Sequence, residues 1–347
     1  MSQKIRFTCL KVSPVLVFLL FFQVTKAQYN FGELDARFQQ YNHELGKNAV
    51  LVIYKDGKII HTKDQEDFKA NTQAPVTDCT KWLTAAVVMT FVDEGKISLD
   101  DKVSKYLPIF ATYSKGYITL RQCLAHMTGI EGSKIGIIKS NHYNSLEEEV
   151  NSFASKHEIQ TNAGTEFRYT DIGASIAGRI VEIVGKKSFE QLAQQRLLKP
   201  LGMRNTTFQL DFDKPANPSL GALSTATDYV NFLGMLLNKG MFKGKRVLSE
   251  KAVAEMEQAQ IPATVKKVMD KDAAGPTYAL GAWVLEQTDD GKTTALAGPG
   301  MPGSWPIIDL CRGYAAVIFT KDQSSSQKKE IFIDIKKAID AAIPCSN

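Results

Sequence analysis

Strand-forming segments lie near both ends of this chain, and a long region with helical patterning separates them. At residues 48–62 (NAVLVIYKDGKIIHT), β-branched and other apolar residues flank Asp56-Gly57, a dipeptide typical of a two-residue hairpin turn. Toward the other end, strands are expected at 278–286, 293–297, 305–309 and 314–320. This order predicts an α+β fold (an α/β sandwich) in which both chain ends build one antiparallel sheet, flanked by helices, around an all-helical insert.

Helical periodicity fills most of the region between these strands. Helices are expected at 78–94, 172–184, 189–198, 226–238 and 249–259, and an amphipathic helix at 329–343. We therefore expect a discontinuous sheet domain formed by residues 28–100 and 271–347, and a helical domain at 101–270. The cleft between them is the expected site for a small-molecule substrate or ligand.

Residues 1–27 have the features of a secretory signal peptide: basic residues, a short apolar run at 14–24, and Ala27 before Gln28. An uncleaved anchor is the alternative, although the apolar run is short for a membrane span. We expect a secreted or periplasmic protein with no stable membrane anchor after cleavage. The leader carries four of the five net positive charges, so the basic balance gives no reason to expect nucleic-acid binding.

Cysteine and histidine patterns give no support for a disulfide framework or a metal centre. Beyond the leader there are four cysteines with no C-x-x-C pair: Cys79, Cys123, Cys311 and Cys345. The five histidines form no H-E-x-x-H or H-x-H pattern. No metal and no other cofactor are expected.

Five stretches together point to a known family. They are KWLTAAVVMTFVDEGKISLDDKVSKYLP (81–108), ITLRQCLAHMTGIEG (118–132), AGTEFRYTDIGASIAGRIVE (163–182), LSTATDYVNFLGMLLNKG (223–240) and FKGKRVLSEKAV (242–253). In their order and spacing they resemble the serine β-lactamase and penicillin-binding-protein superfamily, on its class C and esterase-like side. The resemblance runs from about Asn48 to the end of the chain and implies the same β-lactamase/transpeptidase-like fold.

The superfamily's acyl transfer uses an S-x-x-K motif at a helix start, where the serine attacks a carbonyl and the lysine helps to remove its proton. The matching tetrapeptide here is DCTK, so Lys81 is present but Asp78 stands where the resemblance implies a serine. The second motif matches Tyr169-Thr170-Asp171, which implies a proton-transfer role for Tyr169. Asp171 departs from the usual neutral residue and adds a carboxylate to the expected substrate site.

The third motif, a cation two residues before a glycine, matches Gly298-Pro299-Gly300, so the cation is missing. Gly298 and Gly300 still allow a substrate to approach closely. The resemblance implies that the N–H groups of Asp78 and Met301 form the oxyanion hole. Other S-x-x-K sequences occur only at 325–328 and 326–329, in a polar stretch unsuited to a catalytic helix start.

Each of these residues also has an ordinary structural interpretation. Asp78 can be a helix cap or only an ion-pair partner of Lys81. Cys79 can be a thiolate nucleophile or a buried core residue. Tyr169 can be an ordinary half-buried tyrosine, and His126 a structural residue.

These observations lead to two functional hypotheses. The first is a hydrolase-like cell-envelope protein whose serine acyl-enzyme route is disabled, with Asp78, Lys81 and Tyr169 acting on a small ester, amide or other electrophile. The second is a non-catalytic binding or sensor protein on the same scaffold. Retention of Lys81 and Tyr169 favours the enzyme, whereas loss of the serine and of the third-motif cation favours the binding protein.

Overall fold

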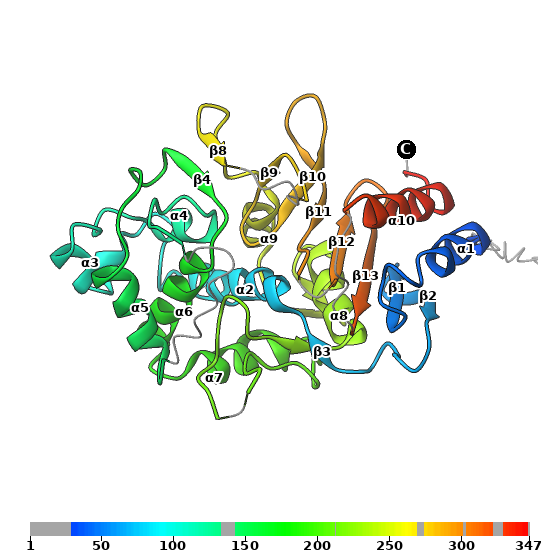
Figure 1. Ribbon diagram of the computed structural model, residues 1–347, viewed down its shortest axis with the longest axis horizontal. Helices are drawn as coiled ribbons and strands as arrows, with labels where there is room; N and C mark the ends of the chain where they lie inside the picture. Colours follow the sequence, from blue (N-terminus) through cyan, green and yellow to red (C-terminus); the bar gives the residue numbers. More distant parts are fainter. Residues whose placement is uncertain are drawn as a thin grey trace, which may run out of the picture.

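The computed structural model describes residues 29–132, 143–211, 213–268, 274–300, 303–321 and 329–345. Its centre is an antiparallel seven-stranded sheet with the order β2-β1-β13-β12-β11-β10-β9 (Figure 1). The strands are β1 (Ala49–Lys55), β2 (Lys58–Asp64), β9 (Thr277–Tyr278), β10 (Trp283–Gln287), β11 (Thr293–Ala297), β12 (Trp305–Asp309) and β13 (Tyr314–Thr320). The pairing of β1 with β13 confirms that both chain ends build one sheet.

Turn geometry explains where the strand predictions held and where one did not. In the β1–β2 hairpin, Asp56 and Gly57 have φ angles of 51° and 80°, as a two-residue turn of this kind requires. The single strand expected at 278–286 is instead two strands, β9 and β10, which pair antiparallel. Gly281 lies between them with φ of 83°, a left-handed conformation that lets the chain reverse there.

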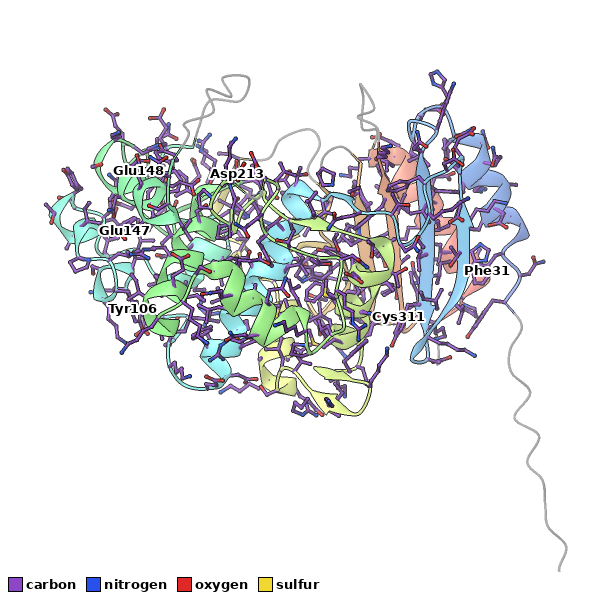
Figure 2. All side chains as sticks on the ribbon, turned by 90° about the horizontal axis from the view of Figure 1, so that it is seen from below. Phe31, Tyr106, Glu147, Glu148, Asp213 and Cys311 are labelled. Carbon is purple, nitrogen blue, oxygen red and sulfur yellow. A yellow bond between two sulfur atoms is a disulfide. The ribbon has the colours of Figure 1, made fainter. Side chains whose placement is uncertain are left out.

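Helices cover both faces of the sheet, and the alternation along β13 shows how. Ala315, Val317 and Phe319 share a core with α2 (Thr80–Asp93) and α8 (Ala226–Leu237). Ala316 and Ile318 face the opposite way, toward α1 (Gly32–Gln40) and α10 (Lys329–Ala342). Figure 2 shows α1 and α10 on one side of the sheet and the helical region on the other. The sequence patterns had not predicted α1.

The helical region surrounds α2. It contains α3 (Ile109–Thr112), α4 (Leu120–Leu124), α5 (Leu146–Ser155), α6 (Ile172–Gly185), α7 (Phe189–Ala193) and α9 (Glu250–Glu257), with short 3-10 turns at Thr77–Cys79 and Val103–Lys105. The helix expected at 189–198 is α7 followed by a π-helical turn, Gln194–Leu198. Three strand pairs that were not expected accompany these helices: β3 (Ala74–Pro75) with β5 (Leu223–Ser224), β4 (Glu166–Arg168) with β8 (Lys266–Val268), and β6 (Met241–Phe242) with β7 (Lys245–Arg246).

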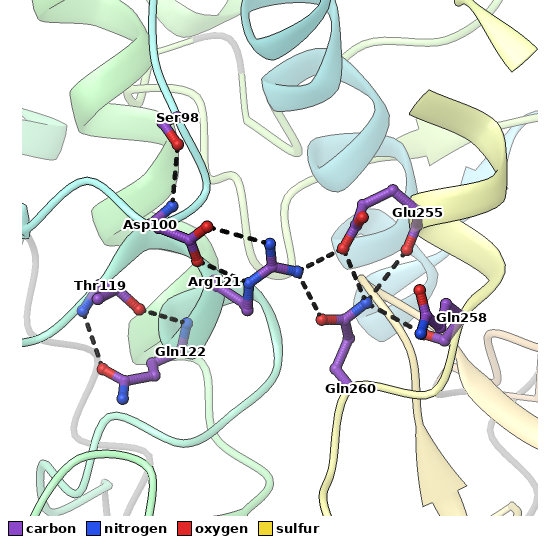
Figure 3. A network of polar contacts seen from close by, with 8 residues as sticks. All are labelled: Ser98, Asp100, Thr119, Arg121, Gln122, Glu255, Gln258 and Gln260. Carbon is purple, nitrogen blue, oxygen red and sulfur yellow. Dashed lines mark hydrogen bonds and ion pairs between the residues drawn. The ribbon is translucent and has the colours of Figure 1, made fainter. Parts of the chain in front are cut away.

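A polar network around Arg121 ties the helical region to the chain that leads back into the sheet (Figure 3). The guanidinium on α4 bonds Asp100, with Nε to Oδ1 at 2.9 Å, and it also pairs with Glu255 on α9. Its Nη1 donates to Gln260 Oε1 at 2.8 Å. The Gln260 backbone N–H then donates to the Tyr278 carbonyl of β9 at 2.8 Å. This network fixes the helical region against the sheet.

A disulfide bond joins Cys311, in the β12–β13 turn, to Cys345, just after α10. The low cysteine count had not led us to expect it, and it is a single bond across 34 residues of sequence. Cys79 and Cys123 are free and buried. No helix in the described ranges is long and apolar enough to cross a membrane. The expected leader, residues 1–27, and the two alternative S-x-x-K sequences lie outside the described residues.

Candidate active site

The candidate site forms where the chain enters α2, the central helix of the molecule. A 3-10 turn at Thr77–Cys79 precedes α2, so the helix expected from residue 78 starts in this tighter turn. Residues 80–91 of α2 are all buried, because the sheet-side helix α8 and the helical region enclose it. Lys81 therefore has only 2% of its side chain exposed, and it needs partners for its charge.

The first partner is Asp78. Lys81 Nζ lies 2.5 Å from Asp78 Oδ1, and the Tyr169 hydroxyl donates to the same oxygen at 3.1 Å. The three residues predicted to be catalytic are thus brought together. Neither the 3-10 turn nor α2 has a side-chain cap at its start, so Asp78 makes no capping hydrogen bond, although it is the acidic residue of the 3-10 turn. The carboxylate instead accepts hydrogen bonds from the side chains of Lys81 and Tyr169.

The second partner is Asp171, at the start of α6. Its Oδ1 lies 2.9 Å from Lys81 Nζ and also accepts a hydrogen bond from Ser219 Oγ at 3.3 Å. The Asp171 side chain is 52% exposed, whereas that of Asp78 is 22% exposed. One buried ammonium is therefore shared by two carboxylates that remain accessible to a ligand.

This arrangement sets the protonation states. Burial lowers the pKa of Lys81, but the charges of Asp171 and Asp78 and their hydrogen bonds outweigh it, and the pKa ends above its usual value. Desolvation raises the pKa of Asp171, yet Lys81 more than compensates and leaves it lowered. Lys81 is thus an ammonium at neutral pH and cannot accept a proton there. Together Lys81, Asp78 and Asp171 carry a formal charge of −1.

Tyr169 remains a neutral phenol. Burial and then the charge of Asp78 raise its pKa well above the usual value for tyrosine. The ring stacks on Trp283 with centroids 5.5 Å apart, and Lys81 Nζ lies 4.9 Å from its centroid. Tyr169 is therefore a fixed proton donor toward Asp78.

His126 packs against the ring of Tyr169. Its ring centroid is 4.3 Å from that of Tyr169, and its Nδ1 accepts a hydrogen bond from the Thr170 N–H at 3.2 Å. Burial, and secondarily the Lys81 charge, lower the pKa of His126 to about 3, so the imidazole is neutral. These contacts fit the structural role expected for His126, which holds the segment that carries Tyr169.

Cys79 points away from the site into the core. It is fully buried, and its Sγ donates to the Ser304 carbonyl at 3.8 Å. Burial, followed by the charge of Asp78, raises the pKa of the thiol well above its usual value. The residue is thus a packed core thiol, as the buried-cysteine interpretation expects.

Gly298 and Gly300 bring the chain after β11 against the start of α2. A Cβ on Gly300 would lie 2.2 Å from the Val76 carbonyl oxygen, and one on Gly298 would lie 2.9 Å from the Trp82 ring. Both positions therefore need glycine for packing. Met301 lies outside the described residues, so its predicted oxyanion-hole role stays a prediction.

Two further residues shape the site without any motif to mark them. Ser219 bonds Asp171, and Tyr278 lies against both Tyr169 and His126, with ring centroids 5.8 Å and 4.7 Å away. Only the fold brings these two residues to the site. Ser219 lies 48 residues after Asp171 in the sequence, and Tyr278 lies in β9, at the start of the final strands. Ser and Tyr at such positions carry no sequence signal of their own.

A cavity of about 270 Å³ is lined by Asn217 and Leu220, which flank Ser219, and by Glu149 of α5. Asp78, Lys81, Tyr169 and Asp171 are not among its lining residues. Within the described part of the chain, no group of three or more His, Cys, Asp or Glu side chains is placed to hold a metal ion. The site's own chemistry is therefore that of two carboxylates, one ammonium and one phenol.

A sheet built from both chain ends, a helical region beside it, and a lysine one turn into the central helix facing a tyrosine define the β-lactamase and transpeptidase class of folds. The family model named Beta-lactamase matches residues 34–337, and the chain belongs to this family. It is thus a member of the Beta-lactamase family, and it is also similar to a penicillin-binding-like relative.

Two curated relatives match part of the chain. Protein flp of Staphylococcus aureus (strain MW2) is 28% identical over 194 residues, which cover 52% of this chain and 39% of the relative. PbpX of Bacillus subtilis (strain 168), provisionally named a penicillin-binding protein, is 26% identical over 228 residues, or 62% of this chain and 56% of the relative. The matched region thus spans less than two thirds of either relative.

Solved structures match nearly the whole chain. A beta-lactamase-like protein of Bacteroides dorei DSM 17855 superposes with a TM-score of 0.81 and 26% identity, covering 91% of this chain and 99% of that one. EstCE1, described as a hydrolase with promiscuous acyltransferase activity, gives a TM-score of 0.75 and 19% identity, with 88% and 97% covered. A family VIII carboxylesterase gives a TM-score of 0.74 and 18% identity, covering 90% of this chain and 97% of that one. The last two comparisons show the shared fold.

Proposed function

We propose that Asp78 occupies the position of the family's nucleophilic serine and that the ordinary serine acyl-enzyme route is disabled in this protein. The spacing to Lys81 and the contacts of Lys81 and Tyr169 with Asp78 Oδ1 support this assignment. A carboxylate that attacked an ester or amide would form a high-energy anhydride. Asp78 therefore suits the role of a base better than that of a nucleophile at a carbonyl.

The proposed activity is hydrolysis of a small ester, amide or other electrophilic substrate in the cleft between the sheet and the helical region. Asp78 takes a proton from water as the water oxygen attacks the substrate carbonyl, and it later returns that proton to the leaving group. The Lys81 ammonium and the Tyr169 hydroxyl stabilise the developing negative charge, together with the N–H groups at Asp78 and Met301. Water is the co-reactant, and no covalent intermediate forms on the protein.

One observation carries this proposal: Lys81 and Tyr169 both hold their protons, while two carboxylates share the ammonium. Among these four groups, proton acceptance falls to the carboxylates. Asp78 is the better candidate of the two because it stands one helical turn before Lys81, at the motif position, and lies beside Tyr169. Asp171 contacts Lys81 and Ser219.

Turnover of p-nitrophenyl butyrate by the purified protein tests this activity. Asp78→Asn keeps the size of the side chain and removes its basicity, so the rate should fall about 100-fold or more. Asp289→Asn, an exposed change in the β10–β11 turn, is the matched control and should leave the rate unchanged. Equal turnover by the wild type and Asp78→Asn would contradict the base role.

A non-catalytic binding protein is the second candidate, and the double ion pair of Lys81 favours it. An ammonium held at 2.5 and 2.9 Å by two carboxylates forms a closed network that lowers the reactivity of each member. A wild type that turns over neither esters nor amides, yet is stabilised against heat by a small molecule, would favour this candidate. In that case the stabilisation should be lost in Asp78→Asn.

For localisation, we propose export to the periplasm or the exterior. The Cys311–Cys345 disulfide supports this, because disulfides persist mainly in oxidising compartments. N-terminal sequencing of protein from the native host should find a start near Gln28. A start at Met1 or Ser2 would contradict cleavage of the leader.

A further inference from the structure

A second cavity, of about 520 Å³, lies at the end of the sheet opposite the candidate active site. It is formed by the β1–β2 turn, the β12–β13 turn and the C-terminal ends of α8 and α9. The register of β1 and β13 shows that the cavity and the candidate active site lie at opposite ends of β13. Lys55 pairs with Tyr314 at the cavity end of β13, whereas Thr320 lies at the other end beside Gly303. The next residue, Ser304, bridges to Gly300, which packs against the start of α2 at the candidate site. The length of β13, about 20 Å, therefore lies between them.

Glu257, the last residue of α9, places an unsatisfied carboxylate in this cavity. Its Oε1 is buried and has no hydrogen-bond partner within the described part of the chain. Burial raises the pKa of Glu257 to about 7, although the nearby charge of Lys239 lowers it. A buried polar atom without a partner is costly, so such an atom on a cavity wall indicates a partner from outside the chain.

The charges around Glu257 favour a cation as that partner. Lys55 is already engaged, because its Nζ donates to the Arg312 carbonyl at 2.7 Å and lies 4.0 Å from Asp56 Oδ1. Lys239 faces the cavity without a hydrogen bond to Glu257 Oε1. The formal charges of Lys55, Lys239, Asp56 and ionised Glu257 cancel. The C-terminal ends of α8 and α9 then add partial negative charge.

The rest of the wall is apolar. Tyr54, Leu236, Leu237 and Leu310 line the cavity, and each packs on the main core from its other side. A cavity of this volume is within the range of small-molecule sites. We propose that it binds a small organic amine, whose ammonium pairs with Glu257 and whose apolar body packs against Tyr54 and these leucines. This site is independent of the function proposed for Asp78.

Calorimetric titration of the full protein with 2-phenylethylamine at pH 8 tests the proposal, with 2-phenylethanol as the neutral comparator. The amine should bind, and the alcohol should bind at least about tenfold more weakly. Glu257→Gln is nearly isosteric and removes a buried charge, so the fold should persist. It should weaken amine binding at least about tenfold. Glu250→Gln, an exposed change at the start of the same helix, is the matched control and should leave binding unchanged.

Two further arms locate the site. Lowering the pH from 8 to 6 protonates Glu257 and should weaken wild-type binding about tenfold, whereas Glu257→Gln should lose this dependence. Asp78→Asn should bind the amine as well as the wild type. Absence of amine binding in the wild type, or unchanged affinity in Glu257→Gln, would overturn the proposal. Loss of binding in Asp78→Asn alone would overturn it too, because the amine would then occupy the candidate active site.

Discussion

Replacing both carboxylates that hold Lys81 should turn the candidate site into a serine acyl-transfer site. Asp78→Ser supplies a hydroxyl one helical turn before Lys81, and Asp171→Asn removes the remaining acceptor of the ammonium. The single variant Asp78→Ser should gain little activity, because Asp171 at 2.9 Å still keeps Lys81 protonated. The double variant should gain far more.

The size of the gain follows from what sets the pKa of Lys81. In the wild type, burial lowers this pKa and the two aspartates raise it by more. Without the aspartates only burial acts, and burial can lower a lysine pKa by up to about 3–5 units. Lys81 would then be partly neutral near pH 8 and could accept the proton of the hydroxyl that Asp78→Ser introduces. General-base assistance of this kind contributes about 100- to 10,000-fold in rate.

The same change should cost stability. A lysine with 2% exposure that loses both partners must keep an uncompensated buried charge or give up its proton, and this should cost about 3–5 kcal/mol of unfolding free energy. For a chain of this size, that corresponds to a fall in Tm of about 4–7 °C. Stability must therefore be measured beside activity, at a temperature where every variant is folded.

The assay is release of p-nitrophenol from p-nitrophenyl acetate at pH 8 by the wild type, Asp78→Ser, Asp78→Ser/Asp171→Asn, and the latter with Lys81→Met. The double variant should exceed Asp78→Ser by at least about 100-fold, and Lys81→Met should abolish the gain. A folded double variant no faster than Asp78→Ser would refute the reasoning that the two carboxylates block Lys81. A gain that survives Lys81→Met would refute the assignment of Lys81 as the base.

Three further predictions concern stability and reactivity. Cys345→Ser opens a disulfide loop of 34 residues and should lower the unfolding free energy by about 4 kcal/mol in urea titrations; equal stability without reductant would contradict it. Cys79 should react slowly with a thiol reagent in the native state and quickly after denaturation, and rapid native labelling would revive the thiolate hypothesis. His126 has a pKa of about 3 in the folded state, below its unfolded value. Its contribution to the unfolding free energy is therefore complete above about pH 6.5 and is lost as the pH falls, by about 2 kcal/mol at pH 5. His126→Asn, which keeps an acceptor for the Thr170 N–H, should reduce this slope in urea titrations at pH 7.5 and 5, and an unchanged slope would assign it to other groups.

The main architecture could be predicted because local patterns determine it. The Asp56-Gly57 turn, the alternation along β13 and the helical spacing of α2 all appear within short windows of sequence. Where a turn carries weak signals, the prediction failed: Gly281 reverses the chain inside what was read as one strand. The disulfide was missed because pairing depends on α10 returning to the β12–β13 turn.

Only the residues of the site that belong to sequence motifs could be predicted. The motif spacing brought Asp78, Lys81 and Tyr169 together in the prediction, as the structure does. The second carboxylate on Lys81 could not be deduced, because Asp171 lies about 90 residues away and the resemblance assigned it to the substrate. The protonation of Lys81 depends on burial and on both aspartates together, so it follows only from the fold.

The most direct test of the central claim is intact-mass analysis of the purified wild type after incubation with a fluorescent penicillin. If Asp78 takes the place of the serine, as proposed, and Lys81 is held as an ammonium, the mass should stay unchanged and no serine should carry the label. A class A or class C β-lactamase treated in the same way is the positive control. A stable covalent adduct mapped to any serine of this chain would contradict the account.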